Sequence, residues 1–307
     1  MKVLFLGTPE FAVKSLDALM KSNHTVVGVV TQPDRAVKHG KTEPCAVKKA
    51  AESYGLPVIQ PIKIRNDVDS LKAFGADIAV TAAYGQILTA AVLDAFPCGV
   101  INVHGSLLPK YRGASPIQSA IADGEKQTGV TIMRTELGID TGDMLLSRAI
   151  EIGDNETAGE LTERLAVLGG ELLVEALDNY DNITPVKQDN EKATHCKMIT
   201  KAEQYIDFDC DARTVVNRIR SLSPVPCAKT VIEGETYKIY KAIVCGEPCA
   251  EKAGTITCST DKLVIACGSG AIEVQTIQAP SKRALEIKEF LRGRKFNVGV
   301  VCAKPQL

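Results

Sequence analysis

Residues 98–109 of the chain read CGVINVHGSLLP. Pro97 and Gly105 bound the apolar part of this stretch, which is typical of a short buried strand. Because side chains alternate along a strand, Asn102 and His104 are expected on one face at its carboxyl end. In open α/β sheets, ligands bind outside the carboxyl ends of the strands. The stretch therefore predicts an α/β sheet and indicates where on that sheet a site lies.

The side chains at this strand end suit the transfer of an acyl-type group to an amine. Asn102 can donate a hydrogen bond to a developing oxyanion without carrying a charge. His104 can exchange a proton near neutral pH. The acidic loop LGIDTGD, residues 137–143, supplies Asp140 as the candidate partner that orients His104. A glycine stands two positions away on each side of Asp140, and we expect these glycines to let the backbone approach a ligand closely.

The first 180 residues alternate short apolar runs with amphipathic stretches, which predicts a mostly parallel sheet covered by helices. Strands are expected at residues 3–6, 25–30, 78–81, 98–103 and 130–133, and helices at residues 9–20, 47–54 and 156–178. The loop after the first strand contains Gly7 but no Gly-x-Gly-x-x-Gly pattern, which disfavours a dinucleotide site. The fold class expected here is a Rossmann-like α/β domain.

The pattern changes after Asn182. A polar passage suggests a linker, then comes one expected helix at residues 212–221, and then β-rich segments separated by glycines. Such a series is typical of a small antiparallel barrel. We therefore expect a catalytic domain at residues 1–185, a linker at 186–203 and a C-terminal β-barrel domain at 204–307.

The composition is that of an ordinary water-soluble protein, with 45% hydrophobic and 24% charged residues and a net charge of −1. The chain has no signal peptide pattern and no apolar run near the ~20 residues of a membrane span, so a cytoplasmic location is expected. The ten cysteines include no Cys-x-x-Cys pair, and no histidine lies near Cys245 and Cys249, which are four apart. We expect reduced thiols and no metal site.

An Asn-x-His pair and an Asp in a glycine-rich turn also occur in loops without catalytic function. The wider pattern decides between the two interpretations. The motif Asn-x-His-x-Ser-Leu-Leu-Pro at 102–109, followed by Gly-Ile-Asp-Thr-Gly at 138–142, resembles the signature of enzymes that use 10-formyltetrahydrofolate. Within that superfamily, nine further segments resemble methionyl-tRNA formyltransferases: residues 7–12, 31–35, 110–118, 129–133, 141–145, 206–208, 217–220, 223–228 and 289–293.

This resemblance implies a reaction and roles for particular residues. The reaction is formyl transfer from 10-formyltetrahydrofolate, as co-substrate, to the α-amine of methionyl initiator tRNA, catalysed by Asn102, His104 and Asp140 without a metal. The implied folate-binding residues are Ser106, Leu107, Leu108, Pro109, Gln86 and Leu88. The implied tRNA-binding residues are Arg35, Lys38 and Lys41, in a basic loop that meets the acceptor end. The second domain resembles an OB fold, its implied role is tRNA binding, and a monomer is expected.

Two segments depart from the family pattern. The loop at 35–44 is shorter and less basic than expected and contains Glu43, and residues 224–227 lack the family's aromatic residue and glycine. These departures affect the expected tRNA contacts and leave the catalytic motif intact. Two alternatives stay open: another 10-formyltetrahydrofolate-dependent formyltransferase or hydrolase that acts on a small amine or a nucleotide sugar, and an RNA-binding protein that has lost catalysis.

Overall fold

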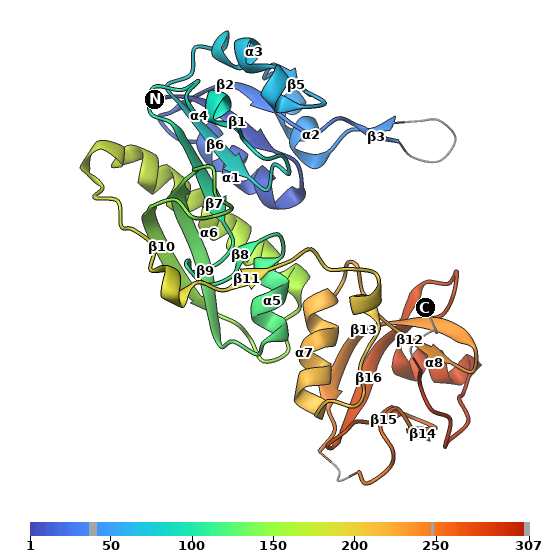
Figure 1. The fold of residues 1–307 in the computed structure, drawn as a ribbon. Helices are drawn as coiled ribbons and strands as arrows, with labels where there is room; N and C mark the ends of the chain where they lie inside the picture. The colour runs from blue at the N-terminus through green and yellow to red at the C-terminus, as the bar shows by residue number, and fades with distance from the viewer. Residues whose placement is uncertain (37–41, 247–248, 304–307) are drawn as a thin grey trace. The chain divides into compact units, whose positions relative to one another are not determined.

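The computed structural model describes residues 1–36, 42–246 and 249–303, which form two compact units (Figure 1). Unit 1 comprises Met1–Pro116, Thr128–Ile150 and Thr162–Cys196. Unit 2 comprises Ile117–Gln127, Glu151–Leu161 and Lys197–Leu307. Two short segments that precede residue 162 therefore belong to unit 2, and unit 1 continues as far as Cys196.

The main sheet of unit 1 has seven strands in the order β10-β9-β7-β6-β1-β2-β5. Their bounds are β1 Lys2–Gly7, β2 Thr25–Val30, β5 Val58–Ile59, β6 Ile78–Ala82, β7 Val100–His104, β9 Gln127–Arg134 and β10 Met144–Glu151. The strands from β7 to β5 run parallel, whereas β9 runs antiparallel to β7. The predicted Rossmann-like, mostly parallel sheet is confirmed. Two small ribbons accompany it: β3 (Arg35–Ala36) with β4 (Thr42–Glu43), and β8 (Arg112–Gly113) with β11 (His195–Cys196).

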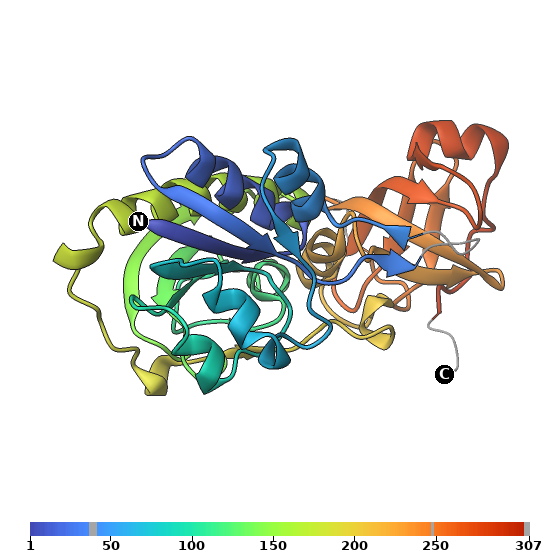
Figure 2. The ribbon, with the colours of Figure 1, turned by 90° about the horizontal axis from the view of Figure 1, so that it is seen from above.

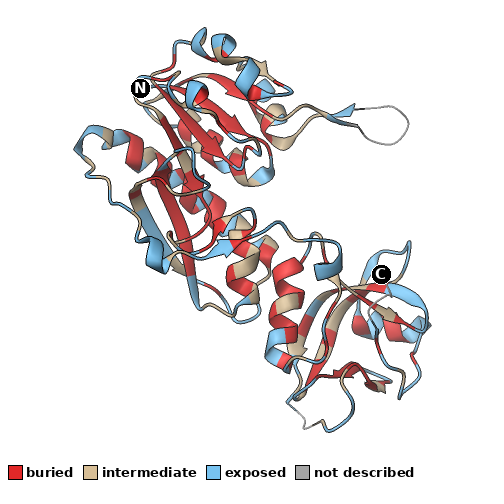
Figure 3. Ribbon diagram, viewed as in Figure 1, coloured by how far each residue is buried: buried red, intermediate tan, exposed pale blue. Residues whose placement is uncertain are grey.

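Helices cover both faces of this sheet, which explains why the central strands β1 and β6 are apolar and buried almost throughout (Figure 3). Figure 2 shows α1 and α2 on one face and α3 and α4 on the other. Up to residue 178, the helices are α1 Glu10–Met20, α2 Ala46–Ser53, α3 Val68–Lys72, α4 Ala90–Leu93, α5 Pro116–Ala122 and α6 Ala158–Asp178. All of α5 but its first residue belongs to unit 2, and α6 begins in unit 2 and continues in unit 1. Short 3₁₀ helices lie at Ile64–Asn66, Tyr180–Asn182, Asn190–Lys192 and Ala202–Gln204.

Two adjacent glycines let α6 lie close to its neighbours. A Cβ atom on Gly169 would come within 2.9 Å of the Val103 side chain on β7. One on Gly170 would come within 2.8 Å of the Lys14 carbonyl oxygen on α1. Helix α6 therefore packs on the same face as α1, directly behind the strand that carries Asn102 and His104.

Unit 2 contains an antiparallel sheet of six strands in the order β12-β13-β16-β15-β14, with β17 paired to β16. The bounds are β12 Ala228–Ile232, β13 Glu235–Val244, β14 Ile256–Ser259, β15 Leu263–Ala266, β16 Ala271–Gln278 and β17 Ala284–Glu286. The register between β13 and β16 shifts on both sides of Lys241. Such irregularities bend a strand and increase its twist, and the sheet curls. The predicted small antiparallel β domain is confirmed in this form.

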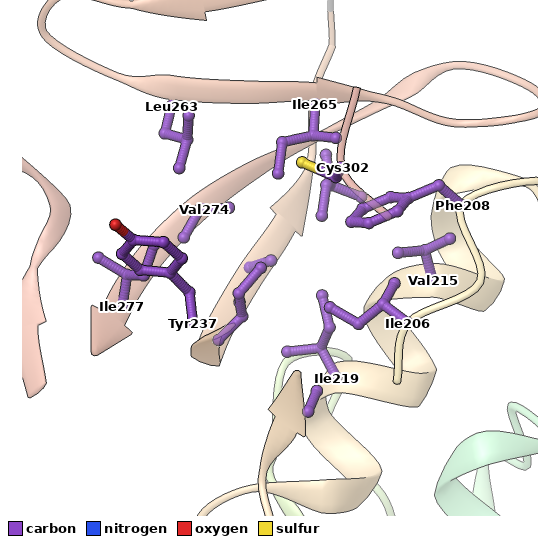
Figure 4. Close-up of a cluster of buried hydrophobic side chains, with 14 of the residues drawn as sticks. Ile206, Phe208, Val215, Ile219, Tyr237, Leu263, Ile265, Val274, Ile277 and Cys302 are labelled. Carbon is purple, nitrogen blue, oxygen red and sulfur yellow. The ribbon is translucent and has the colours of Figure 1, made fainter. Parts of the chain in front are cut away.

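Helix α7 (Ala212–Leu222) packs on the curled sheet, and α8 (Ile287–Gly293) follows β17. Asp211 begins α7, because its carboxylate accepts hydrogen bonds from the backbone N–H groups of Arg213 and Thr214. Figure 4 shows the core between helix and sheet, where Ile219 of α7 and Tyr237 of β13 belong to one buried cluster. Unit 2 therefore has a hydrophobic core of its own.

Candidate active site

Asn102 and His104 lie at the carboxyl end of β7, where the sequence predicts them. Asn102 is opposite Thr81 at the end of β6, and His104 is opposite Thr131 on β9. The Thr81 hydroxyl donates a hydrogen bond of 2.8 Å to Oδ1 of Asn102. Because this bond occupies the amide oxygen, the NH₂ group of Asn102 is the part that can donate to a substrate oxygen.

His104 is 5% exposed, and both of its ring nitrogens face oxygen atoms. Its Nε2 lies 3.0 Å from the backbone oxygen of Tyr111. Because a carbonyl oxygen only accepts, Nε2 carries the hydrogen of this bond. Nδ1 lies 3.6 Å from Oδ2 of Asp140, which is longer than a hydrogen bond. The structure therefore brings His104 and Asp140 together, and Nδ1 is the nitrogen left to exchange a proton.

The carboxylate of Asp140 is also held by the backbone. Its Oδ2 accepts a hydrogen bond of 2.8 Å from the Gly113 N–H. Asp140 itself has a φ of +52°, in the left-handed region that a non-glycine residue seldom adopts. A Cβ atom on Gly142 would come within 2.0 Å of the Arg134 oxygen. Gly142 thus allows the loop to pack against its own chain, in addition to any approach to a ligand.

Thr131 ties the expected folate segment to the sheet. Its hydroxyl donates to the Ser106 carbonyl at 2.8 Å and accepts from the Leu108 N–H at 3.2 Å. The Ser106 hydroxyl donates to the Lys110 carbonyl at 2.7 Å. Leu108 and Ser106 are buried, while Leu107 and Pro109 are half-buried. The segment is therefore a fixed loop beside the end of β7.

Gln86 and Leu88 lie in the turn after β6. The Gln86 side chain accepts from the Ile64 N–H at 2.8 Å and donates to the Pro61 carbonyl at 3.1 Å. Leu88 is 7% exposed and belongs to the core. These side chains support the turn, so the groups of this turn most readily offered to a ligand belong to its backbone.

Of the expected tRNA-binding residues, only Arg35 lies among the described residues, and Lys38 and Lys41 fall outside them. Arg35 is exposed on β3, opposite Glu43 of β4. Asp34 binds Lys48 at 2.7 Å, and Glu43 binds Lys49 at 3.0 Å. Among the residues that the structure describes, Arg35 itself has no ion-pair partner.

A polar network fixes the base of the β3–β4 ribbon. Gln60 donates to Oδ1 of Asp34 at 2.8 Å, and its own amide oxygen accepts from Lys48 at 2.8 Å. The hydrogen bond from Lys48, followed by that from Gln60, lowers the pKa of Asp34 below its usual value. The same Asp34 contact raises the pKa of Lys48, so both groups stay charged near neutral pH.

Three contacts of the site were not found by sequence reasoning: the hydroxyl of Thr81, the hydroxyl of Thr131 and the backbone oxygen of Tyr111. Strand alternation could have suggested the two threonines, because each ends or lines a strand next to β7. The Tyr111 contact depends on a backbone carbonyl, which sequence patterns do not distinguish.

Comparisons with known proteins cover nearly the whole chain. A family model described as formyl transferase matches residues 1–177, and one described as formyl transferase, C-terminal domain, matches residues 198–295. A protein of Acetivibrio thermocellus named methionyl-tRNA formyltransferase is 43% identical over 311 residues, covering 99% of this chain and 100% of the relative. One of Novosphingobium aromaticivorans with the same name is 44% identical over 302 residues, covering 97% and 99%.

Solved structures share the fold. An N-formyltransferase of Helicobacter canadensis, in complex with folinic acid and dTDP-3-aminofucose, has a TM-score of 0.67 at 22% identity. It covers 91% of this chain and 100% of that one. HypX of Aquifex aeolicus, in complex with tetrahydrofolic acid, has a TM-score of 0.67 at 15% identity and covers 95% of this chain and 47% of that one. At these identities the likeness concerns the fold alone.

Proposed function

The chain belongs to the formyl transferase family, and from this membership we propose that it transfers the formyl group of 10-formyltetrahydrofolate to the α-amine of methionyl initiator tRNA. The observation that carries the proposal is the similarity along the whole chain, second domain included, to relatives named methionyl-tRNA formyltransferase. The chemistry of the site also supports the proposal, because the carboxyl end of β7 brings together Asn102, His104 and Asp140.

The reaction begins when the α-amine attacks the formyl carbon and an oxyanion develops. The NH₂ group of Asn102 stabilises the oxyanion by a hydrogen bond, since Thr81 holds its amide oxygen. The Tyr111 carbonyl anchors the ring of His104 through Nε2. Nδ1 then moves the proton that the amine loses and the departing folate nitrogen gains, directly or through a water molecule. Asp140 stabilises the charged ring, and no covalent enzyme intermediate is needed because the formyl group is already activated.

We assign folate binding to the fixed loop of Ser106, Leu107, Leu108 and Pro109 and to the turn of Gln86 and Leu88. The two segments flank the ends of β7 and β6 respectively, so both lie at the same edge of the sheet as Asn102. Arg35, Lys38 and Lys41 bind phosphates of the tRNA acceptor end. The exposure of Arg35 and the absence of a described ion-pair partner support this role, because its charge is available to a phosphate.

The cellular location that we propose follows from the proposed substrate. Among the described residues, no helix is long and apolar enough to cross a membrane. We place the protein in the cytoplasm, where initiator tRNA is charged and used, and we assign it a monomeric state and no metal. Light scattering on the purified protein, with and without tRNA, measures the monomeric state directly.

The proposal is tested by incubating the protein with 10-formyltetrahydrofolate and one of three acceptors, then measuring the formylated product. The acceptors are methionyl initiator tRNA, methionyl elongator tRNA and a dTDP-linked amino sugar. We expect rapid formation of formylmethionine on initiator tRNA only. Turnover with the sugar alone, or release of formate without an acceptor, would instead establish one of the small-substrate enzymes. Tight tRNA binding without turnover would establish an RNA-binding protein that has lost catalysis.

A further inference from the structure

The loop that carries Asp140 is held by a side chain from the polar segment that follows α6. The Nε2 atom of Gln188 donates one hydrogen bond to the Asp140 carbonyl at 2.8 Å and another to the Gly142 carbonyl at 2.7 Å. Both bonds lie within unit 1. One amide group therefore fixes the backbone at Asp140, the proposed catalytic residue, and at Gly142 two residues later.

The third partner of this amide is a buried arginine. Nε of Arg112 donates to Oε1 of Gln188 at 3.0 Å, and another guanidinium nitrogen donates to Asn190 at 2.9 Å. A guanidinium only donates and backbone carbonyls only accept, so the orientation of the Gln188 amide has a single solution. Arg112 is 4% exposed, and a buried charge of this kind holds its hydrogen-bond partners strongly.

Arg112 also stands between two residues that touch the site. The carbonyl of Tyr111 holds His104, and the N–H of Gly113 holds the carboxylate of Asp140. Consecutive residues 111–113 therefore contact His104, Gln188 and Asp140 in turn. A shift of the guanidinium would move the backbone supports of both proposed catalytic side chains.

The Asp140 loop depends on these polar contacts because it has little apolar burial. The neighbouring side chains Leu137 and Ile139 are 67% and 65% exposed. The φ of +52° at Asp140 is unfavourable for a residue with a Cβ atom and persists only when surrounding contacts enforce it. The amide of Gln188 supplies two such contacts at this point in the loop.

We propose that Gln188, oriented by Arg112, is a positioning residue for formyl transfer, which sets the Asp140 carboxylate beside His104. This inference rests on the proposed function, because it assigns Asp140 a role in that reaction. Gln188 contacts neither reacting group. Its effect on the rate is transmitted through the geometry of the Asp140 loop.

The decisive variant is Gln188→Glu. A glutamate keeps the side-chain length and an acceptor for Arg112, but it loses both donated hydrogen bonds and places a negative charge against two carbonyls. We expect kcat to fall by ~10-fold to ~100-fold, the scale of a displaced catalytic group, with KM for tRNA and for the folate within about twofold. Gln188→Ala should act in the same direction. Lys187→Ala is the matched control, because it shortens an exposed side chain next to Gln188 and leaves the bonds of Gln188 and Arg112 intact, and it should keep kcat near wild type.

A double-variant comparison separates positioning from a general loss of structure. In an Asp140→Ala background, Gln188→Glu should lower kcat by less than about twofold, because the group it positions is already absent. A full additional loss there, or an unchanged kcat in Gln188→Glu alone, overturns the inference. If Asp140→Ala itself retains full activity, the proposed catalytic role of Asp140 fails, which is a separate result.

Discussion

At the scale of single residues, the site depends on which atom of each side chain is already occupied. Thr81 occupies the oxygen of Asn102, and the Tyr111 carbonyl occupies Nε2 of His104. What remains is one amide NH₂ group and one ring nitrogen at the end of the same strand. These two groups are the ones that the proposed chemistry requires, an oxyanion donor and a proton carrier.

Removing any of the three proposed catalytic side chains should therefore slow formylation strongly. We expect Asn102→Ala, His104→Ala and Asp140→Ala each to reduce kcat by ~10² or more under saturating substrates. Because the three groups act as a unit, a double variant should lose far less than the product of the single losses. Steady-state formylation rates check both statements, and near wild-type turnover in His104→Ala would contradict the mechanism.

Thr81 offers a finer test of the same site. Thr81→Val preserves the shape of the side chain but removes the hydrogen bond to the Asn102 oxygen, so the amide can rotate and present its oxygen instead. We expect kcat to fall by roughly 5-fold to 13-fold, the effect of losing about 1 to 1.5 kcal/mol of hydrogen bonding. Thr81→Ser keeps the hydroxyl and should stay within about twofold of wild type. Equal losses in both variants would show that packing of the methyl group matters instead.

At the scale of elements, strands and helices with strong apolar patterns were predicted well. The expected strand at 25–30 coincides with β2, and the expected helix at 212–221 ends one residue short of α7. Most of β2 is buried, and α7 alternates buried apolar residues with polar ones at helical spacing, so both patterns are easily recognised in the sequence. The expected helix at 156–178 starts two residues later, at Ala158, because Thr157 and Glu160 form a reciprocal cap. That Thr-x-x-Glu spacing was present in the sequence and could have located the start.

The contacts made by residues 186–203 could not be predicted from the sequence pattern. Its polar composition predicts a linker, yet Val186 pairs with Met144 and β11 pairs with β8. Gln188 binds the Asp140 loop as well. Polar residues that serve a distant backbone look the same in sequence as polar residues in water, because only the fold supplies their partners.

The β8–β11 ribbon depends on one glycine, and its replacement provides a test. Gly113 has a φ of +119°, and a Cβ atom there would lie 2.1 Å from the Cys196 oxygen. Gly113→Ala should lower the free energy of unfolding by more than ~2 kcal/mol and move the N–H that binds Asp140, so activity should fall too. Gly55→Ala is the control, since Gly55 has a φ of +69° and open space around it. It should cost only about 1 to 2 kcal/mol and leave kcat unchanged, as chemical denaturation and rate measurements will show.

A further prediction concerns the basic loop that contains the proposed tRNA-binding residues. Removing Arg35, Lys38 and Lys41 together should raise KM for tRNA and leave KM for the folate unchanged. Each lost phosphate contact should reduce the slope of log K against log salt by ~0.7 to 0.9. A formylation series across salt concentrations measures both, and an unchanged slope would assign tRNA binding to the second domain alone. Asp34 and Glu43, the two acidic residues near Arg35, are bound to Lys48 and Lys49 respectively, so neither neutralises Arg35.

At the scale of the whole molecule, the cysteines form classes that sequence could not separate. All ten thiols are free. Burial raises the pKa of Cys227 to about 11 and those of Cys267 and Cys302 to about 12. Cys227 also has a φ of +72°, in the left-handed region that glycine adopts more readily than cysteine.

These three thiols should be the slowest to react with an alkylating reagent in the folded protein. A raised pKa leaves the thiol protonated, so at pH 8 only roughly a thousandth of Cys227 side chains are thiolate, against about a quarter for an ordinary cysteine. Their modification should speed up as pH rises and should match that of the other cysteines in denaturant. Mass spectrometry of labelled peptides measures each site, and fast labelling of Cys302 at pH 8 in the folded protein would contradict the assignment.

The bond from Gln188 to the Asp140 loop sets a rule for recombining this chain with its relatives. A chimaera spliced at residue 186, where the polar composition begins, would take the glutamine from one parent and the loop it supports from another. A splice at Lys197 or later keeps Gln188, Arg112 and β11 with the sheet they serve. Recombination should therefore tolerate exchange of the C-terminal segment, from Lys197 onward, only when the eleven residues from 186 to 196 are inherited with the sheet of unit 1.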